Sequence, residues 1–147
     1  MFSKALLLAT FVAAAVADIS KFPAFDSFHA NCAMEVTYDG QSCDAVYASM
    51  QKLLTEYQAG DPGKGVYKFI DQKDNTYFWM TRTTPVKKYV DDIAFEFFPT
   101  ASGDCLVKSR SRSQSLSYYD YSTNYCNMWN PLKYTGTFTN QIGRAHV

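Results

Sequence analysis

One stripe of apolar residues at helical spacing, flanked on both sides by segments that alternate between apolar and polar residues, constrains the fold of this chain more than any other feature. The stripe begins after Ser42, which can cap a helix, and stops at the turn signal in residues 60–63. Its members, at positions i, i+4, i+7, i+8 and i+11, are Val46, Met50, Leu53, Leu54 and Tyr57. The pattern predicts an amphipathic helix between the two signals.

Alternation with a period of two predicts the strands. One strand precedes the helix, at 32–38, and four follow it, at 66–73, 76–83, 93–98 and 105–113. A second, short helix is expected to begin at Thr123 or Asn124 and to stop before Pro131, because proline disrupts a helix interior. The order β-α-β-β-β-β-α, with short links, predicts an α+β fold: an antiparallel five-stranded sheet with helices on one face.

The N-terminus has the pattern of a secretory signal peptide. The positive charge of Lys4 precedes an apolar run, 5–14, and two small residues flank one position just before Asp18. The run is too short to span a bilayer, and the polar residues that follow it argue against the alternative of a buried helix. We therefore expect residues 1–17 to be removed and the protein to be secreted, extracellular or in the endomembrane lumen.

The last residues, 141–147, have a different interpretation. They can be encoded by CAG ATC GGA AGA GCA CAC GTC, which from its second base onward resembles the start of a widely used sequencing adapter. We interpret them as an artefact of transcript assembly and exclude them from the fold prediction. The remaining sequence is then an irregular N-terminal segment, 18–31, in which three phenylalanines can pack onto the body, and a single α+β domain, 32–140.

The charge balance excludes some classes of partner. Removing Lys4 and Arg144 with the two excluded segments lowers Lys plus Arg from 14 to 12, against 14 Asp plus Glu. A slightly acidic chain is a poor match for nucleic acid or an anionic membrane surface. No later apolar run approaches the length of a membrane-spanning helix, so we expect no nucleic acid and no membrane span.

The element order resembles the fold class of the TATA-binding protein and of helix-grip proteins. In such sheets the first strand pairs antiparallel with the last, and among the three possible pairings of four cysteines this favours Cys43–Cys105 and Cys32–Cys126. Metal binding is the alternative use of the cysteines. The chain has no close Cys-x-x-Cys pair, and secretion implies an oxidising compartment, so we expect two disulfides, no metal and no cofactor.

From Val90 onward the sequence resembles a widespread, uncharacterised family, a domain of unknown function. Its pattern has an Asp-Asp-aromatic strand, then Val-Arg-Ser-x-Ser-Arg, then a Ser-Asp-x-Gly-x-Asn turn. The matching residues are Asp91, Asp92, Phe95, Val107, Ser109, Ser111, Arg112, Asp120 and Asn124. The departures are about three extra residues near Leu116, Ser122 in place of the glycine, and Tyr125-Cys126 in place of basic residues. A closer resemblance is to uncharacterised secreted protist proteins that end in Thr-Asn-Tyr-Cys-Asn, and neither group implies a known activity.

The last predicted strand carries most of the candidate ligand-binding residues. Its serines face one side of the sheet and its basic residues the other. The small serines leave room for a covering helix or for a ligand, and the arginines can bind an anion or form ion pairs on a solvated face. With an aromatic wall and a carboxylate, the predicted ligand-binding residues are Trp79, Ser109, Ser111, Arg110, Arg112, Tyr119 and Asp120.

No constellation typical of an enzyme is present in the sequence. Asp91 and Asp92 are adjacent on a strand and therefore face opposite sides, His29 is the single histidine outside the excluded segment, and Asp120 is typical of a turn and helix cap. No catalytic residue is predicted. The abundance of Tyr and Phe favours a small binding module for an apolar or aromatic small molecule, and the alternative is an extracellular structural or protein-interaction domain.

Overall fold

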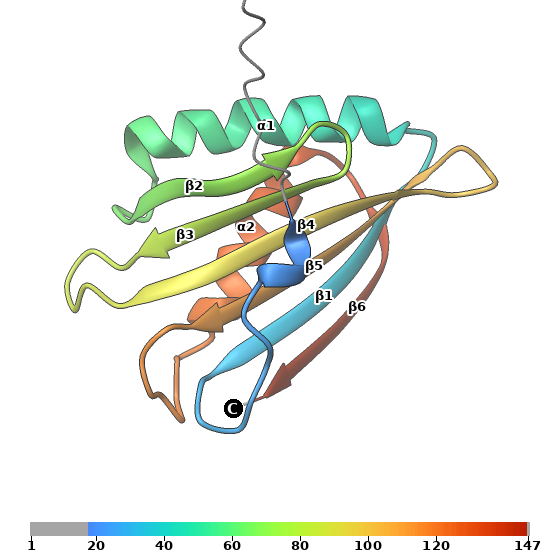
Figure 1. The fold of residues 1–147 in the computed structure, drawn as a ribbon. Coiled ribbons are helices and arrows are strands. Elements are labelled where there is room, and N and C mark those ends of the chain that lie inside the picture. Colours follow the sequence, from blue (N-terminus) through green and yellow to red (C-terminus); the bar gives the residue numbers. More distant parts are fainter. Residues whose placement is uncertain (1–17, 147) are drawn as a thin grey trace, which may run out of the picture.

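The computed structural model describes residues 18–146, so the predicted signal peptide, residues 1–17, lies outside the described residues. The chain forms two α-helices and one antiparallel sheet of six strands, in the order β2-β3-β4-β5-β1-β6 (Figure 1). After the short 3-10 helix η1 (Ile19–Lys21), the elements are β1 (Asn31–Tyr38), α1 (Cys43–Gly60), β2 (Val66–Lys73), β3 (Tyr77–Thr83), β4 (Val90–Pro99), β5 (Cys105–Ser113), α2 (Thr123–Thr135) and β6 (Thr139–His146). The predicted α+β class and antiparallel sheet are confirmed, and the predicted count of five strands is wrong.

Most of the sixth strand, β6, lies in residues 141–147, which the sequence prediction excluded. It pairs antiparallel with β1, and its Ile142 remains 63% exposed. The hydrogen bonds of a sheet ladder join backbone atoms, so an edge strand can form here whatever the origin of its codons. The order β-α-β-β-β-β-α is therefore extended by one strand, and the interpretation of residues 141–147 as an artefact stays a prediction.

Helix α1 forms where its apolar stripe predicts it. The Ser42 hydroxyl accepts a hydrogen bond from the backbone N–H of Ala45 at 3.3 Å, and Asp44 lies in the first turn, where the helix dipole favours a negative charge. The buried side chains on its inward face are those of Cys43, Val46, Tyr47, Met50, Leu54 and Tyr57. These side chains pack with those of the sheet and α2 into one core beneath the two helices.

Helix α2 is longer than the sequence predicts. The expected stop before Pro131 is wrong, because the helix continues through this residue to Thr135. Pro131 and Leu132 are both buried, and the Tyr38 hydroxyl donates a 2.6 Å hydrogen bond to the carbonyl of Leu132. Burial of this turn and its bond to β1 offset the hydrogen bond that the proline cannot donate.

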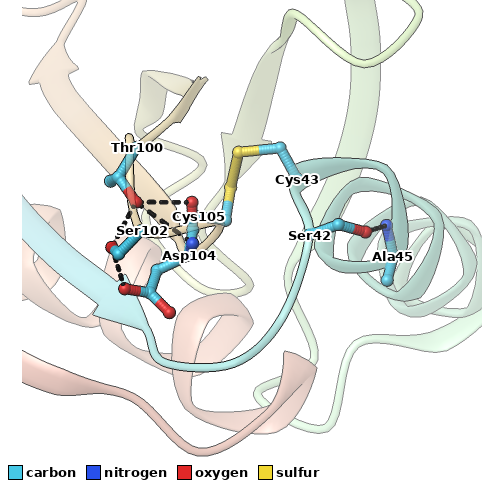
Figure 2. Close-up of a disulfide and its surroundings, with 7 residues drawn as sticks. All are labelled: Ser42, Cys43, Ala45, Thr100, Ser102, Asp104 and Cys105. Carbon is cyan, nitrogen blue, oxygen red and sulfur yellow. Dashed lines mark hydrogen bonds between the residues drawn. A yellow bond between two sulfur atoms is a disulfide. The ribbon is translucent and has the colours of Figure 1, made fainter.

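The pairing of β1 with β5 brings Cys43 and Cys105 together. Tyr38, at the end of β1, lies opposite Cys105, at the start of β5, and Cys43 follows one turn later in the chain. Figure 2 shows the resulting Cys43–Cys105 disulfide, which joins the first residue of α1 to the first residue of β5. The bridge closes a loop with a sequence separation of 62. In the chain-entropy model, a disulfide that closes a loop of that length contributes about 4 kcal/mol to the free energy of unfolding. The first predicted disulfide is confirmed.

The second predicted disulfide, Cys32–Cys126, is wrong. Cys32 points into the core from β1 and is 3% exposed, whereas Cys126 is exposed on α2. Helical geometry gives the reason. Asn124, Asn127 and Met128 occupy the inward face of α2. Cys126 lies on the other side of the helix and therefore faces solvent. Among residues 18–146 there is one disulfide, and these two cysteines are free.

The N-terminal segment covers the face of the sheet opposite the helices, and in Figure 1 η1 lies in front of the sheet while α2 lies behind it. Phe22 is 5% exposed, packs edge-to-face on Trp79 with ring centroids 5.8 Å apart, and lies under the Arg110 guanidinium at 4.8 Å. Phe25 and Phe28 are exposed. One of the three phenylalanines therefore anchors the segment.

Titration of thiols tests the corrected cysteine pairing. The oxidised native protein is expected to show one fast-reacting thiol, Cys126, because Cys32 is buried and its burial raises the pKa of the thiol to about 11. A denaturant without reductant should release a second thiol. Cys126→Ser should remove the fast reaction, and Cys32→Ser, as the matched control, should leave it. No reactive thiol in the denatured, unreduced protein would show that these two cysteines are bridged.

Candidate functional site

The predicted ligand-binding residues lie in three separate places. Ser109 and Ser111 are buried between the sheet and α2. Trp79, Arg110 and Arg112 lie on the opposite face of the sheet, beside the N-terminal segment. Tyr119 and Asp120 belong to the segment that leads into α2. The fold therefore does not gather these side chains into one site, and each place has to be considered by itself.

The serines of β5 face α2 and are bonded within the fold. Ser109 donates to the carbonyl of Met34 at 3.0 Å, and Ser111 donates to Oδ1 of Asn124 at 2.6 Å. Ser113 donates to Oδ1 of Asp91 at 2.8 Å. Because serine is small, α2 can approach the sheet closely enough for its amide side chains to reach the strand.

Asn124 is the centre of these contacts. The side chain is fully buried, and its Nδ2 lies 3.0 Å from the carbonyl of Ala30, 3.1 Å from Oγ of Ser113 and 2.7 Å from Oδ2 of Asp120. One amide therefore joins the start of β1, the end of β5 and the turn before α2. Its loss would leave the buried hydroxyl of Ser111 without its acceptor and would remove one hydrogen bond from each of the other three groups.

Asp91 is a buried carboxyl at the start of β4. It is 2% exposed and accepts hydrogen bonds from Ser113 and, at 2.9 Å, from Nδ2 of Asn127. Burial raises the pKa of Asp91 above its ordinary value of 3.8, although both hydrogen bonds and the positive charge of Arg82 act in the opposite direction. We call Asp91, Ser111, Ser113, Asn124 and Asn127 the buried polar network.

The network continues to the far end of α1 through residues that sequence reasoning missed. Arg82 donates to Oδ1 of Asn127 at 3.4 Å and forms a 2.8 Å ion pair with Asp61. The available signal was the spacing of Asn124, Asn127 and Met128, which places two amides on the apolar face of a helix. A polar residue at such a position has to find a buried partner.

A pocket of about 540 Å³ adjoins the buried polar network. It lies between the β3–β4 loop, residues 84–89, and the segment 113–123, and its buried inner wall includes Asp91 and Ser113. Exposed apolar and aromatic side chains form the rim: Val86, Tyr89, Leu116, Tyr119 and Tyr121. Tyr121 is 93% exposed and Val86 is 82% exposed, so the rim side chains are not part of the core.

Asp120 lines this pocket and shapes the turn before α2. Its Oδ1 accepts from the backbone N–H of Ser122 at 3.0 Å, and its Oδ2 accepts from the N–H of Asn124 at 2.8 Å. Tyr121 and Ser122 both have positive φ, at 52° and 64°. Ser122 occupies the position where the resemblance noted from the sequence predicts a glycine, and glycine adopts such a left-handed backbone without steric cost.

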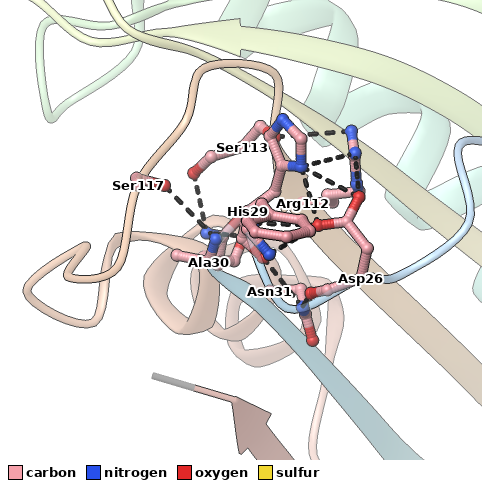
Figure 3. Close-up of polar contacts among 9 residues, drawn as sticks. Asp26, His29, Ala30, Asn31, Arg112, Ser113 and Ser117 are labelled. Carbon is pink, nitrogen blue, oxygen red and sulfur yellow. Dashed lines mark hydrogen bonds and ion pairs between the residues drawn. The ribbon is translucent and has the colours of Figure 1, made fainter.

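Ion pairs cover part of the opposite face of the sheet. Figure 3 shows Asp26, His29 and Arg112 in one cluster: Arg112 Nη2 lies 2.7 Å from Asp26, and His29 Nδ1 lies 2.8 Å from the same carboxylate. The Arg112 hydrogen bond, followed by that of His29, holds the pKa of Asp26 well below its usual range. Arg110 pairs with Glu96 at 3.0 Å.

Trp79 is held in place on this same face. Its Nε1 donates to Asp92 at 2.9 Å, and Phe22 packs on its ring. The N-terminal segment also reaches the pocket, because the backbone N–H of Ala30 donates to the carbonyl of Ser117 at 2.9 Å. The segment thus supports the loop that forms one side of the pocket.

Two kinds of feature are absent from residues 18–146. No group of three or more His, Cys, Asp and Glu side chains in this range is arranged to hold a metal ion. No helix in the same range combines the length and the apolar character needed to cross a membrane.

Comparison with known proteins gives a family match. The family model described as "Protein of unknown function (DUF1499)" matches residues 14–128. The matched range runs from before β1 to the first half of α2, so it contains the buried polar network and both sides of the pocket. No curated protein matches the chain.

Substitution of Asn124 tests the energetic weight of the buried polar network. Asn124→Ala should lower the free energy of unfolding by about 2–4 kcal/mol, because the buried hydroxyl of Ser111 loses its acceptor and three further hydrogen bonds to Nδ2 are removed. Asn130→Ala, at an exposed position of the same helix, is the matched control and should change it by less than about 0.5 kcal/mol. Urea unfolding measures both, and equal losses would contradict the assignment.

The raised pKa of Asp91 predicts a specific pH dependence. As the pH falls, Asp91 takes up its proton in the folded protein before it does so in the unfolded chain. The contribution of Asp91 to the free energy of unfolding therefore rises toward pH 3.8. Asp91→Asn lacks this contribution. The wild type should therefore gain stability relative to the variant between about pH 7 and about pH 4, measured by urea unfolding at a series of pH values. Carboxylates with a lowered pKa, such as Asp26 and Asp104, contribute equally to both proteins, so the comparison between wild type and variant cancels their effect. A difference that does not change with pH would contradict the prediction.

Proposed function

The chain belongs to the DUF1499 family of proteins of unknown function, and on that premise we propose that it is a small-molecule binding module whose ligand occupies the pocket between residues 84–89 and 113–123. The ligand has an apolar or aromatic body and a head group that donates hydrogen bonds. We also propose that the protein acts outside the cytoplasm, after export and removal of residues 1–17. The Cys43–Cys105 disulfide supports this location, because such bonds persist in oxidising compartments.

The single observation that carries the binding proposal is the composition of the pocket. Its volume of about 540 Å³ falls within the range of small-molecule sites, which are mostly apolar with a few polar groups that set orientation. The rim provides exposed tyrosines, a leucine and a valine that the fold does not use in its core. Exposed apolar side chains that gather around a concavity mark an interaction site.

The polar groups of the pocket define the head group of the ligand. The buried ones are oxygen atoms, from the carboxyl of Asp91 and the hydroxyl of Ser113, with those of Asp120 and Thr123 beside them, whereas the ammonium group of Lys87 is on the exposed side of the pocket. Each carboxyl oxygen has two lone pairs, so the oxygens that already accept one hydrogen bond from the protein can accept another from a ligand. A hydroxyl or amine matches this set better than a carboxylate or a phosphate does.

Binding fits the geometry better than catalysis. A buried carboxyl with a raised pKa beside a pocket is also a feature of acid–base enzymes. Both oxygens of Asp91 are bonded to Ser113 and Asn127, and both oxygens of Asp120 are bonded to the turn before α2. These contacts give both carboxyls a structural role in the fold.

One observation favours the alternative of a protein-interaction domain. Tyr118 is 66% exposed on the same segment as the rim residues but does not line the pocket, so the aromatic surface extends beyond the concavity. A protein partner would use this wider surface and would not need the buried inner wall. The two functions therefore differ in which substitutions weaken binding.

Aromatic fragments test the proposed ligand class. Benzylamine, which has a donor head, should bind with a dissociation constant of about 1 mM, and benzoate, which has an acceptor head, should bind more weakly. NMR titration of the labelled protein measures both, with shifted signals expected from residues of the 84–89 and 113–123 segments. The Tyr119→Ala, Tyr121→Ala double variant should weaken benzylamine several-fold, because it removes two aromatic walls.

Tyr134→Ala is the matched control for that experiment. Tyr134 is 70% exposed on α2 and does not line the pocket, so its removal should leave benzylamine binding unchanged. Native mass spectrometry of the secreted protein should in addition show a co-purifying small molecule. Equal binding of both fragments, or shifts outside the two segments, would overturn the proposal. A bound peptide whose affinity depends on Tyr118 would select the alternative.

A further inference from the structure

We propose that removal of residues 1–17 exposes an α-ammonium group at Asp18 that binds to the carboxylate of Asp71, and that this contact fastens the N-terminal segment to the sheet. The site is a receptor for the new N-terminus of this same chain. It lies on the face of the sheet opposite the helices, away from the pocket, and does not depend on the proposed ligand.

The geometry of the receptor is present in the fold. The backbone nitrogen of Asp18 lies 2.9 Å from Oδ2 of Asp71, and the hydroxyl of Tyr77 donates to the same oxygen at 3.0 Å. The register of β2 against β3 shifts between Phe69 and Asp71, a bulge-like irregularity that changes the direction of the side chains that follow. The bulge and Tyr77 together orient the carboxylate toward the N-terminus of the segment.

The position of the Asp18 nitrogen is set by residues that follow it. The side chain of Asp18 caps η1 by accepting from the N–H of Ser20 at 3.0 Å, and η1 leads directly to the buried Phe22. Phe22 is fixed by Trp79 and Arg110 on the sheet. These contacts all lie on the C-terminal side of the proposed cleavage point, so cleavage leaves them intact.

Cleavage changes the chemistry at this nitrogen. Hydrolysis of the Ala17–Asp18 peptide bond by an exporting peptidase consumes one water, leaves a carboxylate on Ala17 and leaves an amine on Asp18. At neutral pH the amine takes up a proton, since an α-amino group has an ordinary pKa of about 8. A neutral amide with one N–H becomes a cation with three, opposite a carboxylate that already lies at hydrogen-bonding distance. Asp18 itself adds a second negative charge beside it, and Lys21 is the nearest cation of the same short helix.

The contact between the Asp18 ammonium group and Asp71 would also affect the loop beside the pocket. The segment that it fastens continues through the Asp26–Arg112 ion pair to Ala30, whose N–H bonds to Ser117 in the loop beside the pocket. Maturation would thus support this loop from a distance. The uncleaved chain retains the neutral bond and lacks the ion pair.

Two start points and one substitution test the proposal. Chains that begin at Asp18 or at Val16 are prepared, each with and without Asp71→Asn, and their melting temperatures are compared at pH 7. Two additional residues displace the α-amine by about 7 Å, out of reach of the carboxylate. The Asp18 start should melt about 3 °C higher than the Val16 start, and Asp71→Asn should abolish this difference. Glu56→Gln, at an exposed position on α1, is the matched control and should preserve it.

A second measurement does not depend on the stability of the variant. Acetylation of the α-amine by a limiting reagent at pH 7 should be several-fold slower for the Asp18 start than for the Val16 start, and Asp71→Asn should remove the protection. Mass spectrometry of the naturally exported protein should find Asp18 as its first residue. Equal melting and labelling of the two starts, a difference that survives Asp71→Asn, or a natural N-terminus at another residue would each overturn the proposal.

Discussion

Strand β5 contacts the layers on both faces of the sheet, because serine and arginine alternate along its second half, 109–113, and the strand lies between β4 and β1. On one face Ser111 bonds to Asn124 of α2, and on the other Arg110 and Arg112 pair with Glu96 and Asp26. A larger side chain at Ser111 would push α2 away from the strand and break the amide contacts that depend on its close approach. The same strand therefore determines the spacing of the helix layer and the position of the N-terminal segment.

The two ends of β5 are stabilised by different forces. At its start, Cys105 is bridged to α1 and lies beside apolar residues of the core. At its end, Ser113 belongs to the buried polar network and adjoins the pocket. Covalent closure therefore restrains the end that is remote from the pocket, whereas the pocket end depends on hydrogen bonds that have to be satisfied together. A buried network of this kind specifies one arrangement of α2, since any shift would leave Asp91 or Asn124 without partners.

The periodic part of the sequence predicted most of the fold, and the parts without a clear period were the ones that failed. The stripe of α1 and the alternation of β5 identify both elements, and the antiparallel pairing of β1 with β5 then places Cys43 beside Cys105. In α2 the inward face carries two asparagines, so an apolar period is absent and the outward position of Cys126 was not recognised. The N-terminal segment has no period at all. Its place on the sheet follows from the tertiary contacts of Phe22 and Asp26, which no local pattern reports.

The side chains predicted to bind a ligand lie in three separate places for a related reason. Trp79, Arg110 and Arg112 have the side chains of a binding site, but the N-terminal segment engages them, and the serines are bonded to the fold. The segment before α2 is exposed to solvent. Its residues Tyr121 and Ser122 have a left-handed backbone, which disfavours residues with a Cβ. Each such residue costs about 1 kcal/mol, and the segment contributes exposed tyrosines to the surface instead of apolar area to the core. A segment that is strained and exposed, yet fixed by Asp120 and Asn124, is not explained by stability alone. Its position beside the pocket gives the physical argument for placing function there.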